Sequence, residues 1–488
     1  MLVPLGYVAS YTWSLGPVAT WDLIARPRVG ELLRNTVGLL LGAMALSTLI
    51  GVACAWLVER SDLPLRRVWH VLFVAPLAIP AFVNSYGWVS LTHAVQGYAG
   101  AVLVVSLSYA PLVYLPTVAA MRTLDPALEE VAHSLGLDRW TAFRRVVLSG
   151  VRPGVLGGAL LVGLHVLAEF GALQMLRFPT FTTAIYDHYR SAFNSAPANV
   201  LAGVLVLGCL LLLVAELSLR GDVALWRVGA GSARSVDRVR LGPMRPVALC
   251  AALVLVTLSL GVPVSSLVHW LLVGSSTDFP AGELVSATVT TAGLGLGAAA
   301  VTVVLALPVV WLAVRHRGRL ANLIERATFT AHALPGIVVA LALVAVSIRS
   351  VRPLYQTLPL LLLGYAILFL PRAVVSIRSS LEHAQPVLED VARSLGERPA
   401  GVLVRVTLPL IRNGLGAGAA LVFLAVSTEL TATLLMAPIG TSTLATEFWS
   451  NSSSLAYGAA APYALLLVVV SLPATWLLSR QARGGVLA

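Results

Sequence analysis

The sequence contains no lysine, and all 33 of its basic residues are arginine. A phosphate-binding loop of the common nucleotide-hydrolysing type places a lysine on the nucleotide phosphates, so this chain does not hydrolyse ATP by that route. Charged residues make up only 11% of the 488 residues and hydrophobic residues 58%, whereas an ordinary soluble domain is about 25% charged. The composition excludes a soluble enzyme and indicates a protein that crosses a membrane many times.

Cysteine is also scarce, and the three that occur lie in or beside apolar runs: Cys54, Cys209 and Cys250. No CxxC pair or Cys/His cluster is present, so we predict neither a disulfide nor a metal site. An intramembrane enzyme has no supporting HExxH or GxSxG context, and no catalytic residue or cofactor is expected in the chain. The net charge of +11 comes from arginines between apolar runs, which is typical of membrane topology and argues against nucleic-acid binding.

Apolar runs long enough to cross a bilayer, which takes about 20 residues each, recur along the whole chain. Eleven are evident, at 35–58, 68–91, 99–121, 154–176, 198–219, 246–272, 285–314, 322–347, 357–377, 414–436 and 459–479. A shorter apolar segment at 1–14 contains Pro4 and Gly6, which weaken it as a helix, and is counted provisionally as a first span. The pattern predicts an all-α polytopic membrane protein with about twelve transmembrane helices.

Arginine is distributed unequally between the two sets of connections. With a cytoplasmic C-terminus, 24 arginines fall in inner connections and seven in outer ones, while Arg326 and Arg372 lie in or beside spans. Positive residues concentrate on the cytoplasmic side, so we expect the C-terminus there, in a plasma-membrane protein.

The chain repeats itself across a polar, arginine-rich linker at 220–245. An offset of 255 pairs Arg60 with Arg315 and Pro80 with Pro335, and an offset of 260 places LEEVAHSLG (128–136) on LEDVARSLG (388–396). The second offset also pairs Glu169 with Glu429, Thr183 with Thr443 and Asp187 with Glu447. We therefore predict two parallel, pseudo-symmetric halves, 1–219 and 246–488, related by an axis along the membrane normal.

Each half carries the same short polar segment between two spans. Apolar residues at i, i+3 and i+7, followed by glycine, predict short amphipathic helices near 126–136 and 386–396. We expect these helices on the cytoplasmic face, where they would present charge and small residues such as Ala132 and Ala392 to a groove on a partner protein. The alternative is a plain interfacial connector, which two copies with the same spacing make less attractive.

These segments resemble the EAA motif of binding-protein-dependent ABC importer permeases, in which Glu-Ala-Ala is followed by three residues and a glycine, then by nine residues, Ile, one residue and Leu-Pro. The resemblance implies the type I importer permease fold, with a coupling helix in each half. It also implies two separate cytoplasmic ABC ATPase subunits, which carry ATP and Mg²⁺, and an extracytoplasmic solute-binding protein. The residues assigned to ATPase coupling are Glu129, Glu130, Ala132, Gly136, Glu389, Asp390, Ala392 and Gly396.

Two carboxylates, Glu169 and Glu429, lie in stretches that are otherwise apolar and are predicted to be spans. Such a residue usually faces a bundle interior or a cavity, so one interpretation is a transient site for cationic cargo on the translocation pathway. The other is that both cap or brace neighbouring helices. His165, one turn before Glu169, suggests metal ligation only weakly and fits a helix-packing histidine better.

The stretch 169–194, with its PTFTTAIY sequence, resembles the corresponding segment of ferric-iron importer permeases, so ferric iron is the expected cargo. Thiamine, a polyamine, an organophosphonate or sulfate would fit the same class. The donors Tyr186, Asp187, His188 and Tyr189 would suit iron, yet a loop that contacts the binding protein would look similar. A rival from another class is an ion-coupled secondary transporter acting through Glu169 and Glu429, which does not predict paired coupling helices.

Overall fold

The computed structural model describes residues 2–124, 127–191, 196–220, 238–273, 279–316, 318, 323–324, 327–328 and 334–484. Regular structure in these residues is helical, and the one extended contact among them is an isolated bridge between Ser61 and Val239. The prediction of an all-α chain is confirmed.

Apolar helical stretches in the described residues overlap all eleven predicted spans, although part of the span at 322–347 lies outside the described residues and the helices of the spans at 154–176 and 414–436 end at Ala168 and Ser427. Seven are continuous: α3 (Pro27–Arg60), α6 (Tyr98–Thr123), η3 with α9 (Phe143–Ala168), Ala196–Ala215 of α12 (Ala196–Arg220), η4 to α14 (Gly242–Val273), α15 (Ala281–Arg315) and α18 (Leu358–His383). Two are bent pairs, Arg66–Ala78 with Ala81–Val89 and Pro399–Leu410 with Arg412–Ser427, and two are shorter, α17 (Gly336–Ser350) and Tyr457–Pro473 of α25 (Tyr457–Gly484). Length and composition thus identify seven to nine crossing helices and a multi-pass membrane protein. The total of twelve stays a prediction, because α1 (Leu2–Leu15) has only 14 residues.

The elements that make up the composite stretches, and the short helices that connect the stretches, have the following bounds. In the first part of the chain they are α2 (Pro17–Ile24), α4 (Arg66–Val74), η1 (Ala75–Ala78), α5 (Ala81–Val89), η2 (His93–Val95), α7 (Ala127–Ser134), α8 (Arg139–Ala142), η3 (Phe143–Val147), α9 (Leu148–Ala168), α10 (Gly171–Met175) and α11 (Phe181–Ser191). In the second part they are η4 (Gly242–Met244), α13 (Arg245–Val256), η5 (Thr257–Gly261), α14 (Val262–Val273), η6 (Arg352–Leu354), α19 (Pro386–Ser394), α20 (Pro399–Val402), η7 (Leu403–Thr407), α21 (Leu408–Leu410), α22 (Arg412–Ser427), α23 (Thr431–Met436) and α24 (Leu444–Ser453).

Proline breaks the helices at matched places in the two repeats. Pro80 takes an extended ψ of 144° directly before α5, and the two helices around it bend by 91°. Pro335, its partner at the offset of 255, takes a ψ of 141° directly before α17. Proline lacks an N–H and disfavours a helical residue before it, so a chain break at these positions follows from the sequence.

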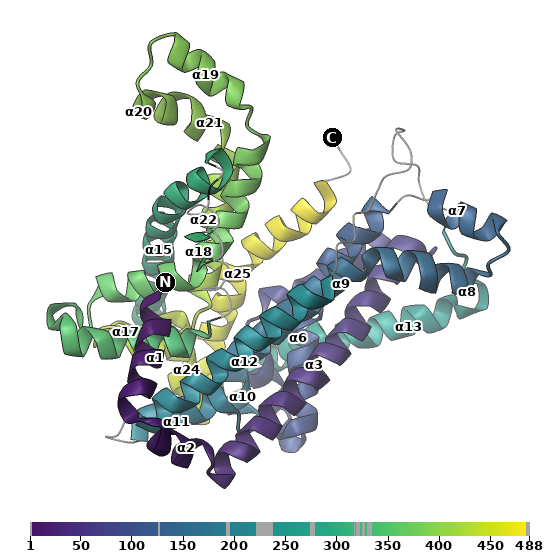
Figure 1. The fold of residues 1–488 in the computed structure, drawn as a ribbon. Helices are drawn as coiled ribbons and strands as arrows, with labels where there is room; N and C mark the ends of the chain where they lie inside the picture. The colour runs from purple at the N-terminus through teal and green to yellow at the C-terminus, as the bar shows by residue number, and fades with distance from the viewer. Residues whose placement is uncertain are drawn as a thin grey trace. The chain divides into compact units, whose positions relative to one another are not determined.

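The chain forms two compact units, each built around three long helices. The α3 unit comprises Ala25–Ala184, Leu207–Gly274 and Thr475–Ala488, and in it α3, α6 and α9 pack side by side. The α15 unit comprises Met1–Ile24, Ile185–Val206 and Ser275–Ala474, and in it the repeat equivalents α15, α18 and α22 pack in the same way (Figure 1).

Small residues allow these helices to approach closely. A Cβ added at Gly158 of α9 would lie 2.6 Å from the Cα of Val113 in α6, and one added at Gly295 of α15 would lie 2.8 Å from the ring of Phe423 in α22. Close backbone approach through glycine is a common way for membrane helices to associate, because lipid tails supply no hydrophobic drive between them.

The compact units do not coincide with the predicted halves, because each takes a helix from the other half's sequence. In the α15 unit, α1 packs on α17, where the Arg349 guanidinium lies 5.8 Å and 5.4 Å from the ring centres of Tyr7 and Tyr11. In the α3 unit, α14 packs on α5, and Ser90 and Ser266 share a 2.6 Å hydrogen bond. The halves 1–219 and 246–488 stay a predicted division of the sequence, and residues 221–237 of the predicted linker lie outside the described residues.

Candidate coupling site

The second predicted coupling helix is α19. It begins at Pro386, whose missing N–H suits a first helical turn, and it ends where Gly396 adopts a φ of +89°. Beyond the glycine, the N–H of Glu397 donates to the carbonyl of Ala392 at 3.1 Å, which closes the helix in the manner of a glycine C-cap.

The first predicted coupling helix, α7, ends in the same way. Gly136 has a φ of +81°, and the N–H of Leu137 donates to the carbonyl of Ala132 at 3.1 Å. Both short helices are therefore present where the repeat predicted them, and both glycines are required by the turn that follows.

The face that these helices expose differs from the predicted one. Ala132 and Ala392 are buried, at 4% and 8% exposure, so they do not meet a partner directly, and that expectation was wrong. They pack inward because each small side chain lets its helix sit against the rest of the chain. The exposed face is apolar instead, formed by Val131 and Leu135 on α7 and its end, and by Val387, Leu388, Val391 and Leu395 on α19 and its end. Exposed apolar side chains gathered on a short helix are typical of a protein-docking surface.

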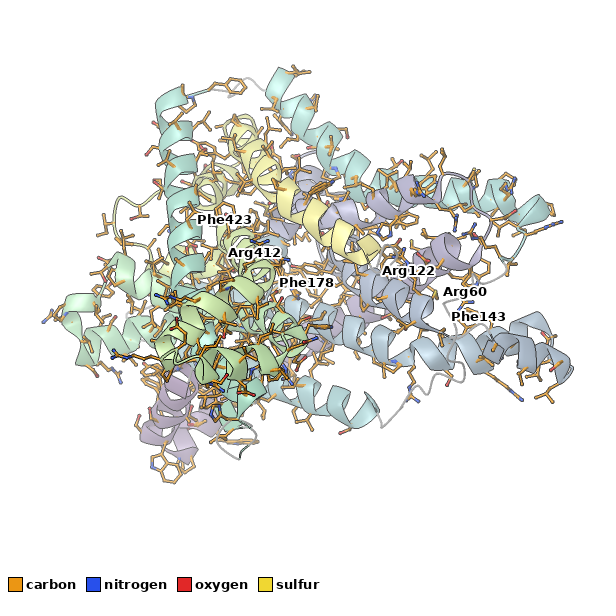
Figure 2. All side chains as sticks on the ribbon, turned by 90° about the horizontal axis from the view of Figure 1, so that it is seen from above. Arg60, Arg122, Phe143, Phe178, Arg412 and Phe423 are labelled. Atoms are coloured by element: carbon orange, nitrogen blue, oxygen red, sulfur yellow. The ribbon has the colours of Figure 1, made fainter. Side chains whose placement is uncertain are left out.

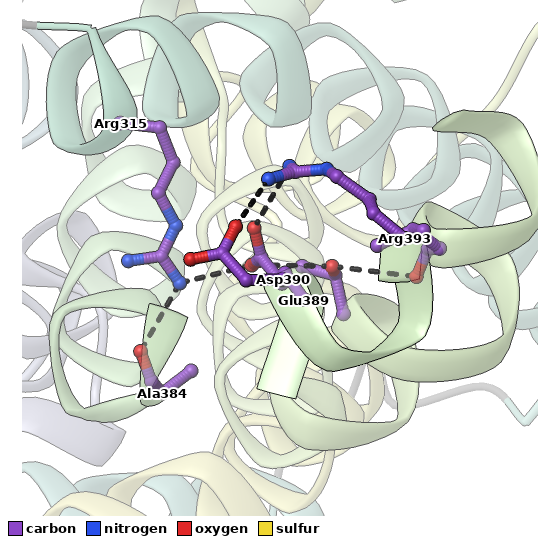
Figure 3. Close-up of polar contacts among 7 residues, drawn as sticks. Arg315, Ala384, Glu389, Asp390 and Arg393 are labelled. Atoms are coloured by element: carbon purple, nitrogen blue, oxygen red, sulfur yellow. Dashed lines mark hydrogen bonds and ion pairs between the residues drawn. The ribbon is translucent and has the colours of Figure 1, made fainter. Parts of the chain in front are cut away.

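Glu389 points into the chain rather than toward a partner (Figure 3). It is 2% exposed, and its carboxylate lies 3.0 Å from the Arg315 guanidinium at the end of α15. The Thr407 hydroxyl donates to the same carboxylate at 3.3 Å, and Arg315 also donates to the carbonyl of Ala384 at 3.1 Å. A buried charge needs such partners, so Glu389 joins α19 to α15, and its assignment to ATPase coupling stays a prediction.

Asp390 does lie on the exposed side of α19. Its side chain is 67% exposed and pairs with Arg393 at 2.7 Å, one turn along the helix. The side chains of Glu129 and Glu130, their counterparts in the first repeat, lie outside the described residues.

A π-helical turn follows each predicted coupling helix, and the sequence reasoning missed both. η3 at Phe143–Val147 and η7 at Leu403–Thr407 are related by the offset of 260, each lying just before the long helix α9 or the pair α21 and α22. π-Turns are rare and frequently occur at functional sites. No composition signal marks them, but their identical place in the repeat does.

Glu169 and Glu429 lie at breaks between helices, so the expectation that they sit within spans was wrong. α9 ends at Ala168, and the Glu169 carboxylate accepts the N–H of Ala172 at 3.0 Å and the hydroxyl of Tyr109. α22 ends at Ser427, and Glu429 accepts the N–H of Ala432 at 2.9 Å. Each carboxylate caps the short helix that follows it, α10 or α23, as the bracing interpretation proposed.

The segments after these breaks align three residues away from the predicted register. Thr180 and Thr183 exchange hydrogen bonds at the start of α11, as Thr443 and Thr446 do at the start of α24. Thr183 therefore corresponds to Thr446 rather than to Thr443. The pairing of Asp187 with Glu447 fails for the same reason: the second loop is longer, and register across a loop is not set by the helices.

Helix packing accounts for His165. Its Nδ1 lies 2.8 Å from the carbonyl of Leu161, and its ring centre lies 5.2 Å from that of Tyr109. Within the described part of the chain, no group of three His, Cys, Asp or Glu residues is arranged to hold a metal ion.

The chain is all-α and multi-pass, it repeats a core of three helices, and it carries a matched pair of short helices with exposed apolar faces. These features define a two-halved membrane transport permease. Comparison with known proteins places it in a family. Residues 47–219 and 307–484 match the family described as the binding-protein-dependent transport system inner membrane component, and the chain belongs to that family.

Individual relatives agree with this assignment. The chain is 38% identical to the Fe(3+)-transport system permease protein FbpB 2 of Haemophilus influenzae, over 99% of this chain and 96% of the relative. It is 28% identical to the sulfate transport system permease protein CysW of Synechocystis, over 36% of this chain and 73% of the relative. With CysT of Salmonella typhimurium the identity is 26%, over 44% of this chain and 84% of the relative.

Proposed function

We propose that this chain is the membrane permease of an ATP-driven importer and that it carries ferric iron delivered by an extracytoplasmic binding protein. The observation that supports this most directly is the pair of matched short helices, α7 and α19, each ending at a positive-φ glycine with exposed apolar residues beside it. Two equivalent docking helices suit two identical motor subunits, one under each half.

The energy source lies on another chain. The sequence has no lysine for a phosphate-binding loop, so two cytoplasmic ABC ATPase subunits bind ATP and Mg²⁺, and the permease itself needs no cofactor. The arginine distribution orients α7, α19 and the C-terminus toward the cytoplasm.

Movement of the ATPase pair reaches the membrane helices by two routes from α19. One is covalent, through α20, η7 and α21 into α22. The other is the buried Arg315–Glu389 pair, which connects α19 to the end of α15. Because α19 is connected to both α22 and α15, it moves together with them. This suits a helix that transmits movement of the ATPase to the membrane helices.

Ferric iron is the cargo because the relative that matches nearly the full length of the chain is an Fe(3+)-transport permease. Sulfate is the second candidate, since the CysW and CysT relatives match part of the chain. Glu169 and Glu429 act as helix caps beside the path rather than as cargo ligands in this proposal.

Reconstitution tests the proposal. The purified chain, reconstituted with its ATPase in vesicles, should take up radioactive ferric iron only with ATP enclosed in the vesicles and the iron-loaded binding protein outside, because import runs from the binding-protein side to the ATPase side. Uptake of sulfate but not of iron would show that sulfate, the second candidate, is the cargo. ATP hydrolysis by the chain alone would refute the assignment of the motor to another subunit.

A further inference from the structure

The end of the linker is docked on the turn after α3. Val239 pairs with Ser61 in the isolated bridge, and its N–H donates to the carbonyl of Arg60 at 2.9 Å. Asp62 accepts the N–H of Leu241 at 2.9 Å and pairs with Arg245 at 2.6 Å. The Leu241 N–H, together with Arg245, holds the pKa of the Asp62 carboxyl below its usual value, so the contact is made by a carboxylate at neutral pH.

This contact lies at a membrane surface. The span α3 ends at Arg60 and the span that contains α13 begins at Gly242, and the bridge joins the two ends. The ends of crossing helices lie at the level of the lipid headgroups.

Docking of the linker gathers arginines on this surface. Arg238 and Arg240 flank the bridged Val239, and Arg66 at the start of α4 lies close enough to Arg67 and Arg238 for mutual repulsion. Arg67, Arg238 and Arg240 are exposed and Arg66 is half-buried.

The nearby carboxylates are already engaged. Glu59, which also attracts Arg66, pairs with Arg122 at 2.6 Å, and Asp62 pairs with Arg245. Among the residues that the structure describes, no carboxylate forms an ion pair with Arg66, Arg67, Arg238 or Arg240. Figure 2 shows Arg60, Arg122 and Phe143 at this end of the α3 unit. The four arginines therefore leave positive charge on this surface that no carboxylate in the described part of the chain neutralises.

Exposed apolar side chains border the same cluster. Leu65 is 74% exposed and has a φ of +55°, a conformation that is unfavourable for leucine. Val68 of α4 is also exposed, as are Met244 of η4 and Val247 of α13, the helix that packs on α4. Arginines beside outward apolar side chains match a lipid, whose headgroup carries a phosphate and whose tails are apolar.

We propose that Arg66, Arg67, Arg238 and Arg240 form a binding site for the phosphate headgroup of an anionic phospholipid, and that docking of the linker on Asp62 assembles it. The site depends on the two sequence halves being one chain, because Arg238 and Arg240 come from the linker and Arg66 and Arg67 from the first half. An acidic surface of a protein partner would match the charge of the arginines but would not pack against the bordering apolar side chains.

The test uses the purified full-length chain in detergent, titrated with phosphatidylglycerol, phosphatidylcholine or inorganic phosphate, with bound molecules counted by native mass spectrometry. Phosphatidylglycerol should bind at least about tenfold more tightly than phosphatidylcholine, because each surface arginine contributes about fivefold. Arg66→Gln with Arg238→Gln should weaken it about thirtyfold. Displacement of the lipid by millimolar phosphate alone would make this a free-phosphate site and overturn the proposal.

Two further variants separate a built site from general attraction. Arg144→Gln with Arg145→Gln removes the same charge from exposed positions of η3, and it should change the affinity less than about fivefold, the contribution of one surface arginine. Asp62→Ala removes a negative charge, so general attraction predicts tighter lipid binding, whereas loss of the docked linker predicts weaker binding. Tighter lipid binding by Asp62→Ala would refute the site, and so would equal losses of lipid affinity in the two double variants. Thermal unfolding of each variant checks that it is folded.

Discussion

Arg315 and Glu389 form a buried ion pair that ties a short surface helix to the end of a membrane-spanning one. The N–O distance is 3.0 Å, and the two side chains are 13% and 3% exposed. They are 74 residues apart, and the repeat relates Arg315 to Arg60, which is itself buried.

Removal of one partner should loosen α19. Glu389→Ala leaves the Arg315 charge buried without its carboxylate, a change that typically costs about 3–5 kcal/mol. We expect faster hydrogen exchange of the α19 amides and a loss of ATP-driven uptake, while the ATPase still copurifies through the exposed face.

A charge exchange makes this prediction specific. Arg315→Glu with Glu389→Arg should recover part of the exchange protection, because the pair is re-formed in reverse. Arg378 and Glu382, an exposed pair one turn apart, provide the control: Glu382→Ala should change stability by about 0.5 kcal/mol or less. Equal losses of stability in Glu389→Ala and Glu382→Ala would show that the buried pair contributes no more than an exposed one.

The apolar faces of α7 and α19 should carry ATPase docking. Leu135→Asp with Leu395→Asp places charges on side chains that are 75% and 80% exposed, so the chain should fold normally but lose its ATPase in copurification. Leu455→Asp, at a 61% exposed leucine elsewhere, should retain the ATPase. Normal copurification by the double variant would show that docking uses another surface.

Charge reversal on the same helices is a second probe of docking. Glu130→Arg with Asp390→Arg should leave the protein inserted and detach the ATPase, because Asp390 is exposed on α19. The insertion is checked by membrane fractionation and the attachment by copurification. An intact complex would count against these carboxylates as contacts.

The two helix-capping glutamates should tolerate glutamine but not alanine. Glutamine keeps the oxygen that accepts the N–H of Ala172 or Ala432, so Glu169→Gln with Glu429→Gln should preserve thermal stability and uptake. Alanine removes the cap and should cost about 1 kcal/mol at each position. A cation site would behave differently, because loss of charge by glutamine would then abolish uptake without lowering the unfolding temperature.

Gly158 should resist even the smallest substitution. Its added Cβ would lie 2.6 Å from the Cα of Val113, so Gly158→Ala must separate α9 from α6 and lower the unfolding temperature. Gly208 of α12 has no atom within 4 Å of its added Cβ. Gly208→Ala should therefore be neutral or stabilising by up to about 1 kcal/mol, since alanine favours the helix.

Periodicity and spacing predicted a large part of this molecule. The eleven apolar runs, the proline breaks at Pro80 and Pro335, and the stops at Gly136 and Gly396 all depend on local physics: bilayer thickness, a missing N–H, and a left-handed turn. The repeat predicted which segments are equivalent, although it failed beyond the loop where Thr183 turned out to correspond to Thr446.

The direction in which side chains point could not be predicted in this way. An acidic residue in a surface helix is ordinarily exposed, and only the approach of Arg315 from 74 residues away makes burial of Glu389 favourable. The same holds for Glu169 and Glu429, since an apolar neighbourhood in sequence does not reveal that the helix ends just before each of them.

By itself, the sequence determined that this is a lysine-free, two-halved membrane permease with a matched short helix in each half, because composition and repeated spacing are properties of the chain alone. Tertiary structure alone decided which carboxylates face inward, which apolar side chains remain available to a partner, and that α1 packs with the second half's α17. These depend on contacts between residues far apart in sequence, where the free energy of burial is set by neighbours that no local pattern specifies.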